Sequence, residues 1–74
     1  MLSKEQIEQD NEALEKLVDR YGLAKVTDKL SDIAAAKASH IDENWQDGPM
    51  ANRWATGGQK LSRTARDISR ELAI

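Results

Sequence analysis

A run of basic side chains near the C-terminal end carries the clearest chemical pattern of this sequence. Four cations follow one another at intervals of three, three and four residues: Lys60, Arg63, Arg66 and Arg70. On a helix this spacing gathers them on one face, where they could contact phosphate groups or an acidic protein surface. Asp67 and Glu71 dilute the charge, and no aromatic side chain for base stacking lies among them. A solvated face of an amphipathic helix explains the same spacing, so nucleic-acid binding is the second interpretation.

The single histidine, His40, is the residue that would suggest metal or acid–base chemistry. Ligands on one helical face need a spacing of three or four residues, and only Glu43 and Asn44 have that relation to His40. Neither completes an H-E-x-x-H pattern, and the sequence has no cysteine. We therefore interpret His40 as a structural or surface side chain that forms hydrogen bonds. The sequence predicts no catalytic residue, no metal site, no cofactor and no small-molecule substrate, and hence a protein that is not an enzyme.

Two tryptophans, Trp45 and Trp54, lie on either side of an Asp-Gly-Pro sequence at residues 47–49. Because both flank the same turn, we expect them to pack in one apolar cluster with Ile41 and Met50. The alternative is that one ring stays exposed as an anchor for a protein partner, since tryptophan is enriched in interface hot spots.

Asn11 interrupts an apolar stripe in which Ile7, Leu14, Val18 and Tyr21 recur at helical spacing. A polar residue at the margin of an apolar face is one explanation. The other is a buried asparagine that pairs with its copy across a homodimer, which fixes the register at some cost in stability.

Composition limits the class of protein further. Seventy-four residues form a single domain, residues 1–74, close to the size below which folds need disulfides, a metal or a second copy. No apolar run approaches a membrane span, and the charged N-terminal segment lacks the apolar region of a secretory signal, so we expect a cytoplasmic protein. Eleven acidic and six basic residues give residues 1–48 a charge of −5, whereas two acidic and five basic residues give residues 49–74 a charge of +3. This asymmetry favours self-association or a partner that binds one half.

Periodicity and capping residues predict an all-α fold, a compact bundle of three helices. Ser3 and Gln6 have the spacing of a capping box, and Gly22 is suited to end a helix, so the first helix covers about residues 4–21. Only Gly22 separates it from the next helix, and the two therefore form an antiparallel hairpin or an angled corner.

The second helix covers about residues 23–46 and ends before Pro49, which is suited to the first turn of a third helix at about residues 49–73. Two adjacent glycines, Gly57 and Gly58, cost about 2 kcal/mol relative to alanine, so we expect the third helix to be kinked or broken there. The predicted core consists of large side chains: Leu14, Val18, Leu30, Ile33, Ile41, Trp45 and Trp54.

Four short motifs in the central segment form a pattern: Tyr21-Gly22-Leu23, then Lys37-Ala38 with His40-Ile41, then Asn44-Trp45-Gln46-Asp47, then Ala51 with Trp54. This pattern, Y-G-L, K-A-x-H-I, N-W-Q-D and A-x-x-W, resembles that of a family of short uncharacterised bacterial and phage proteins. The resemblance covers about residues 18–54, half of the chain. It implies a helical domain of bacterial or phage origin, and it implies no activity.

These features favour a small protein-interaction module that self-associates, as a homodimer, or docks on a larger bacterial or phage assembly through its C-terminal basic amphipathic helix. The candidate partner-binding residues are Arg53, Trp54, Lys60, Arg63, Arg66 and Arg70, and Asn11 is the candidate for setting the register of a dimer. The alternative is a small DNA- or RNA-binding regulator that uses the basic face of the last helix. No membrane binding is expected, because the apolar side of the segment after Gly58, which carries Leu61, Ala65, Ile68 and Leu72, lacks tryptophan and phenylalanine.

Overall fold

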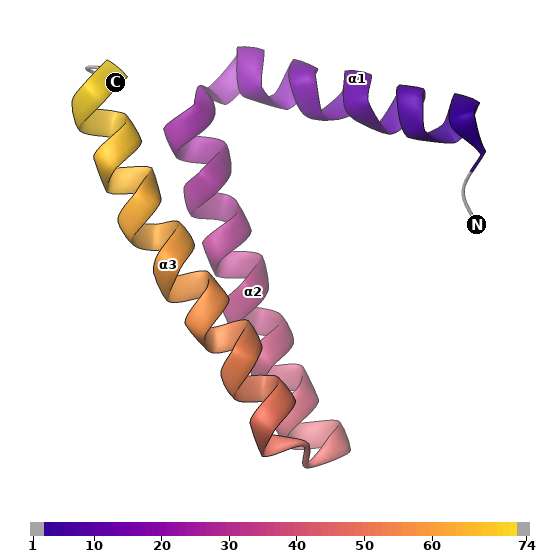
Figure 1. Cartoon of the computed structure of the whole chain (residues 1–74), viewed down its shortest axis with the longest axis vertical. Coiled ribbons are helices and arrows are strands. Elements are labelled where there is room, and N and C mark those ends of the chain that lie inside the picture. Colours follow the sequence, from indigo (N-terminus) through magenta and orange to yellow (C-terminus); the bar gives the residue numbers. More distant parts are fainter. Residues whose placement is uncertain (1–2, 73–74) are drawn as a thin grey trace.

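The computed structural model describes residues 3–72 and consists of three α-helices joined by short connections (Figure 1). They are α1 (Lys4–Tyr21), α2 (Leu23–Trp45) and α3 (Gly48–Leu72), and no strand occurs between residues 3 and 72. The prediction of an all-α chain with three helices is confirmed, and the bounds agree to within one residue. Residue 73, which we included in the third helix, lies outside the described range. Within that range, no helix combines the length and the apolarity that crossing a membrane requires.

Side-chain caps fix the starts of α1 and α3. Ser3 is the N-cap of α1, and its Oγ accepts a hydrogen bond of 3.1 Å from the backbone N–H of Gln6. The reciprocal bond of a capping box does not form, because the Gln6 side chain donates to Asp10 Oδ1 at 3.0 Å instead. At the second cap, Asp47 Oδ1 accepts a hydrogen bond of 3.1 Å from the backbone N–H of Met50. The chain therefore starts both helices where the sequence predicts.

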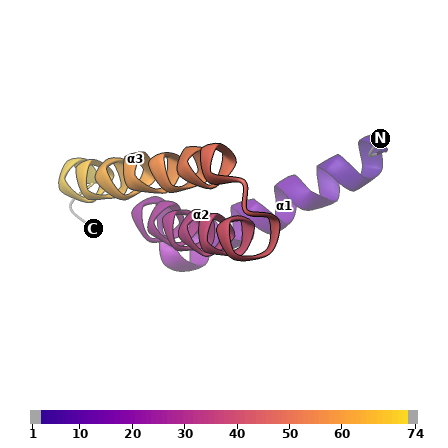
Figure 2. The ribbon, with the colours of Figure 1, turned by 90° about the horizontal axis from the view of Figure 1, so that it is seen from below.

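Helices α2 and α3 form an antiparallel hairpin (Figures 1 and 2). The seam between them consists of small side chains. Positions that recur at intervals of three and four residues face each other across it, as in a coiled coil. The buried seam residues are Ala24, Thr27, Ala34 and Ala38 of α2 with Ala51, Gly58 and Ala65 of α3. Small side chains let the two backbones approach closely. The hydroxyl of Ser31 in α2 therefore donates a hydrogen bond of 2.8 Å across the seam to the carbonyl oxygen of Gly58.

The prediction of a core of large apolar side chains is wrong. Ala34 is 6% exposed, whereas Leu30 is 43%, Trp54 38% and Trp45 72% exposed. The two tryptophans do not form a buried cluster. For Leu30 and Trp54 the physical reason is the phase of the helical pattern, because the stripe of large residues that contains them lies one position before the small-residue seam. Trp45 is the last residue of α2 and lies beyond Ala38, the last buried residue of that helix. The large side chains flank the seam instead of filling it.

Helix α3 continues without a break through the two glycines, so the alternative of two separate helices does not occur. Gly58 lies where α3 approaches α2 closely, so that a Cβ atom at this position would stand 3.2 Å from both the Ala34 Cβ and the Ser31 carbonyl oxygen. A Cβ at Gly57 would meet no atom within 4 Å. The packing against α2 thus explains one glycine and helps to offset the poor helix propensity of both.

Helix α1 projects from the hairpin as an arm and buries none of its residues (Figure 2). Of the two alternatives for its junction with α2, the angled corner is the one that forms. Gly22 is the single connecting residue, with φ 88° and ψ 155°, a backbone region in which only glycine is free of strain. The arm packs against α2 alone. The resulting shape measures 37 × 36 × 13 Å, with a radius of gyration of 14.7 Å against about 11 Å for a compact domain of this length.

Candidate protein-interaction surface

One side of the α2–α3 hairpin carries most of its large apolar side chains. On each helix they lie next to the seam, one position out of phase with the buried small residues. We call this surface the apolar face, and it consists of Leu23, Val26, Leu30 and Ile33 of α2 with Met50, Trp54, Leu61, Ile68 and Leu72 of α3. Each of these side chains is exposed or half-buried. Within residues 3–72, α3 packs against α2 alone, and α2 packs against α3 and α1.

The stripes of α2 and α3 lie on the same side of the hairpin. In an antiparallel pair, positions that precede the seam residues in each helix meet on one face. Lys37 continues the stripe of α2, and its Nζ atom lies 5.7 Å from the centre of the Trp54 ring in α3. This cation–π contact joins the two stripes across the seam, and its ammonium group is the charged group within an otherwise apolar surface.

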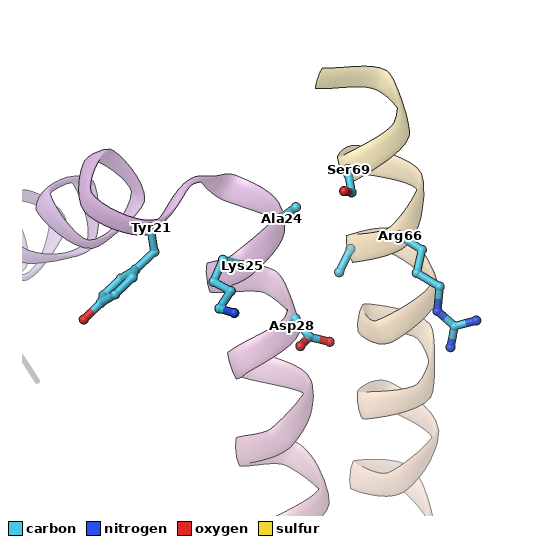
Figure 3. A pocket seen from close by; sticks show the side chains of 7 residues that line it. Tyr21, Ala24, Lys25, Asp28, Arg66 and Ser69 are labelled. Carbon is cyan, nitrogen blue, oxygen red and sulfur yellow. The ribbon is translucent and has the colours of Figure 1, made fainter. Parts of the chain in front are cut away.

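The opposite side of the hairpin is polar and only shallowly hollowed. At the open end, near the corner with α1, a hollow of about 380 Å³ is lined by small and charged residues, among them Lys25, Asp28 and Arg66 (Figure 3). Figure 3 shows Tyr21 pointing away from α3 and Arg66 pointing outward from α3. The other residues that line it are Tyr21, Ala24, Ala65 and Ser69.

The exposed area of the chain is large for its mass. The protein exposes 6120 Å² of solvent-accessible surface, whereas a folded monomer of 8.3 kDa exposes about 4,600 Å². The excess is roughly 1,500 Å². Stable obligate homodimers bury about 1,000–2,500 Å² on each chain, so the excess matches the area that one such interface covers.

The arm has an apolar stripe of its own. Ile7, Leu14, Leu17 and Tyr21 are each at least 40% exposed, and Leu14 reaches 52%. Asn11 lies within this stripe and is exposed. A single helix of 18 residues is marginally stable in water, because most of the stability of short helices comes from packing of the apolar side. The structure of one chain therefore leaves two apolar surfaces uncovered, on α1 and on the hairpin.

The structure places the candidate partner-binding residues at three different locations. Arg53, Lys60, Arg63 and Arg70 are exposed on the side of α3 that faces away from α2. None of these cations forms an ion pair with a described residue. Trp54 belongs instead to the apolar face, and Arg66 borders the polar hollow. Sequence reasoning missed the α2 half of the apolar face, because it assigned Leu30 and Ile33 to the core; the small residues in phase with the seam were the signal that could have corrected it.

His40 is a surface residue that forms hydrogen bonds, as the sequence predicts. It is exposed near the C-terminal end of α2, where Asn44 Nδ2 donates to His40 Nδ1 and to the His40 carbonyl oxygen, each at 3.0 Å. Between residues 3 and 72, no group of three or more acidic, histidine or cysteine side chains is arranged to hold a metal ion.

Comparisons with protein-family models, with curated proteins and with solved structures found no match to this chain. The resemblance of residues 18–54 to a family of short bacterial and phage proteins therefore stays a prediction. The function has to be argued from the surfaces of the molecule itself.

Proposed function

We propose that this protein is a small protein-interaction module, not an enzyme, and that it self-associates through the apolar face of its hairpin. The observation that carries the proposal is that small side chains are buried between the helices, whereas large apolar side chains lie at the surface. Alanine, glycine, serine and threonine fill the seam, while leucine, isoleucine, methionine and tryptophan stay at the surface. Monomeric proteins rarely expose a continuous apolar surface of this extent, and larger ones mark interaction sites.

Energetics support the same conclusion. Burying a leucine or isoleucine side chain contributes roughly 1.5–3 kcal/mol, and the chain leaves Leu30 and Ile33 about half exposed. Domains of this size are marginally stable even with a filled core. A second copy that covers the apolar face would supply the burial that the single chain lacks, without disulfides or a metal.

The test is the absolute mass of the purified full-length protein by light scattering after size exclusion, over a hundredfold range of concentration. We expect a dimer of about 16.6 kDa, twice the 8.3 kDa of the chain, that dissociates only on dilution. Leu30→Gln should raise the dissociation constant at least about tenfold, because a polar group replaces an apolar one at the interface. Ala36→Gln is the matched control on an exposed side of the same helix. A monomer at every concentration would overturn self-association.

The basic side of α3 supports a second candidate, a DNA- or RNA-binding regulator. Arg53, Lys60, Arg63 and Arg70 are exposed and not neutralised within the described chain. Phosphate contacts of this kind weaken steeply with salt. Binding of a mixed-sequence duplex in about 50 mM salt, lost in the Arg63→Glu/Arg66→Glu variant, would support this candidate. Undetectable binding, or binding that survives the reversal, would exclude it.

A further inference from the structure

The arm and the hairpin each have an apolar surface that the same chain cannot cover. Gly22 alone connects them, and the helices of antiparallel bundles are usually joined by about 2–8 residues. The corner also holds α1 to one side of the hairpin (Figure 1). The arm therefore cannot fold back onto the apolar face of its own chain while Gly22 keeps its conformation and α2 begins at Leu23.

Resting on the proposed self-association, we propose that the dimer is formed by exchange, with α1 of each chain lying on the apolar face of the partner's hairpin. A second copy supplies the missing cover for both surfaces at once. Because the two chains are identical, each contributes one arm and receives one. The dimer closes on itself by two-fold symmetry and leaves neither surface free for a third chain.

Charge decides between this arrangement and one in which the two arms pair with each other. Six acidic and three basic residues give α1 a net charge of −3, and five basic and two acidic residues give α3 a net charge of +3. Two arms side by side would place like charges together, whereas an arm on the partner's α3 places opposite charges together. Like-charge contact across an interface is unfavourable, and charge complementarity fixes register and orientation.

The charges that border the two apolar surfaces also have matching spacing. Glu8 and Glu15 follow Ile7 and Leu14 at the edge of the stripe of α1, seven residues apart. Arg53 and Lys60 lie at the outer edge of the apolar face on α3, also seven residues apart. Two turns of helix separate each pair by about 10.5 Å along the axis, so both acidic groups can face both basic groups in one register.

Dimensions fit as well. The stripe of α1 from Ile7 to Tyr21 spans about 21 Å, and the apolar face from Met50 to Leu72 spans about 33 Å along α3. The arm is short enough to lie entirely on the partner's hairpin. Lys37, the ammonium group within the apolar face, would then meet an arm of opposite net charge.

The experiment uses two full-length variants. The first reverses the edge of the arm, Glu8→Lys with Glu15→Lys, and the second reverses the edge of the hairpin, Arg53→Glu with Lys60→Glu. All four side chains are exposed in the single chain, and far-ultraviolet circular dichroism checks that each variant keeps its helices. The chains are mixed at equal concentration, and native mass spectrometry measures what fraction of the dimers is mixed.

Exchange predicts that the two variants prefer each other about tenfold over the statistical mixture, because both arm–hairpin contacts of the mixed dimer regain opposite charges. It also predicts no such preference when the arm variant is mixed with the natural chain, since one contact of that dimer stays repulsive. Preference of the arm variant for the natural chain would show that arms pair with arms and would overturn the proposal. A statistical mixture of the two variants would overturn it as well.

These outcomes are separate from failure of the proposed function. If the natural chain is monomeric at every concentration, self-association itself is wrong. If the natural chain is dimeric but the charge-reversed chains mix without preference, self-association stands and only the exchange of arms is wrong. Raising the salt from about 50 to 500 mM should reduce the preference, because exposed charges are screened at high ionic strength.

Discussion

The α2–α3 hairpin and the α1 arm differ in how they use apolar residues. Both contain helices with an apolar stripe, yet only the hairpin buries side chains, and those it buries are small. The seam works by close approach of two backbones, which needs little side-chain volume. Within the described chain the arm contacts α2 alone, and its leucines stay exposed. The comparison teaches that different residues of this chain hold its helices together and form its large apolar surfaces.

Within the hairpin, a substitution at Gly58 should have the largest effect on the free energy of unfolding. A side chain there would meet the Ala34 Cβ and the Ser31 carbonyl oxygen at 3.2 Å and would disturb the hydrogen bond from Ser31 to the Gly58 carbonyl. We expect Gly58→Val to lower the free energy of unfolding by about 2–3 kcal/mol, as over-packed interiors do. Thermal and denaturant unfolding, followed by circular dichroism, measure the change.

Gly57→Val is the matched control for this prediction. Added atoms at that position have open space, and valine has a slightly better helix propensity than glycine, so stability should change by less than about 0.5 kcal/mol. Equal losses of stability in both variants would mean that the substitutions act on the conformation of α3 alone. Close approach of α2 and α3 would then not be what stabilises the hairpin.

How much of this architecture could be predicted depends on which signal each feature leaves in the sequence. Caps such as Ser3 and Asp47 act on their immediate neighbours, so local residues were enough to find the helix ends. The content of the core is not a local property. Large residues at helical spacing suggested a core containing Leu30, but the stripe of small residues one position later is the one that meets the other helix.

The candidate surface could be predicted only in part for the same reason. Charge asymmetry and the cations of α3 are visible in composition, and the structure keeps them exposed. The apolar face joins Trp54 to Lys37, which are 17 positions apart in the sequence and belong to different helices. Their contact depends on the phase of two helices around a shared seam. The pairing of α2 with α3 fixes that phase. The periodicity of a single segment does not show how it pairs with another helix.

The corner between the two regions depends on Gly22, and changing it should have an intermediate effect. Its φ of 88° and ψ of 155° strain any residue with a Cβ atom. We expect Gly22→Ala to lower the free energy of unfolding by roughly 1–2 kcal/mol. If the arm turns instead to relieve the strain, the free energy of dimer formation should weaken by a similar amount, which raises the dissociation constant of the dimer. Unfolding curves and the mass at several concentrations measure the two effects. Gly48→Ala, at the first residue of α3 and without a positive φ, should change neither quantity; equal effects would exclude a special role for the corner.

A substitution at Asn11 should have the smallest effect on stability, and it tests directly where the arm lies in the dimer. It is exposed in the single chain and lies within the stripe that the exchanged arrangement places on the partner's apolar face. Asn11→Leu should then keep the mass of the dimer and raise its stability by roughly 0.5–1 kcal/mol, because apolar area is added to the interface. An asparagine that pairs with its own copy would behave differently, since its loss relaxes register and oligomeric state. Light scattering would then show a changed or heterogeneous mass.

Gln9→Leu, on the other side of the same helix, is the control for this prediction. Equal changes in the mass and stability of the two variants would place Asn11 outside the interface.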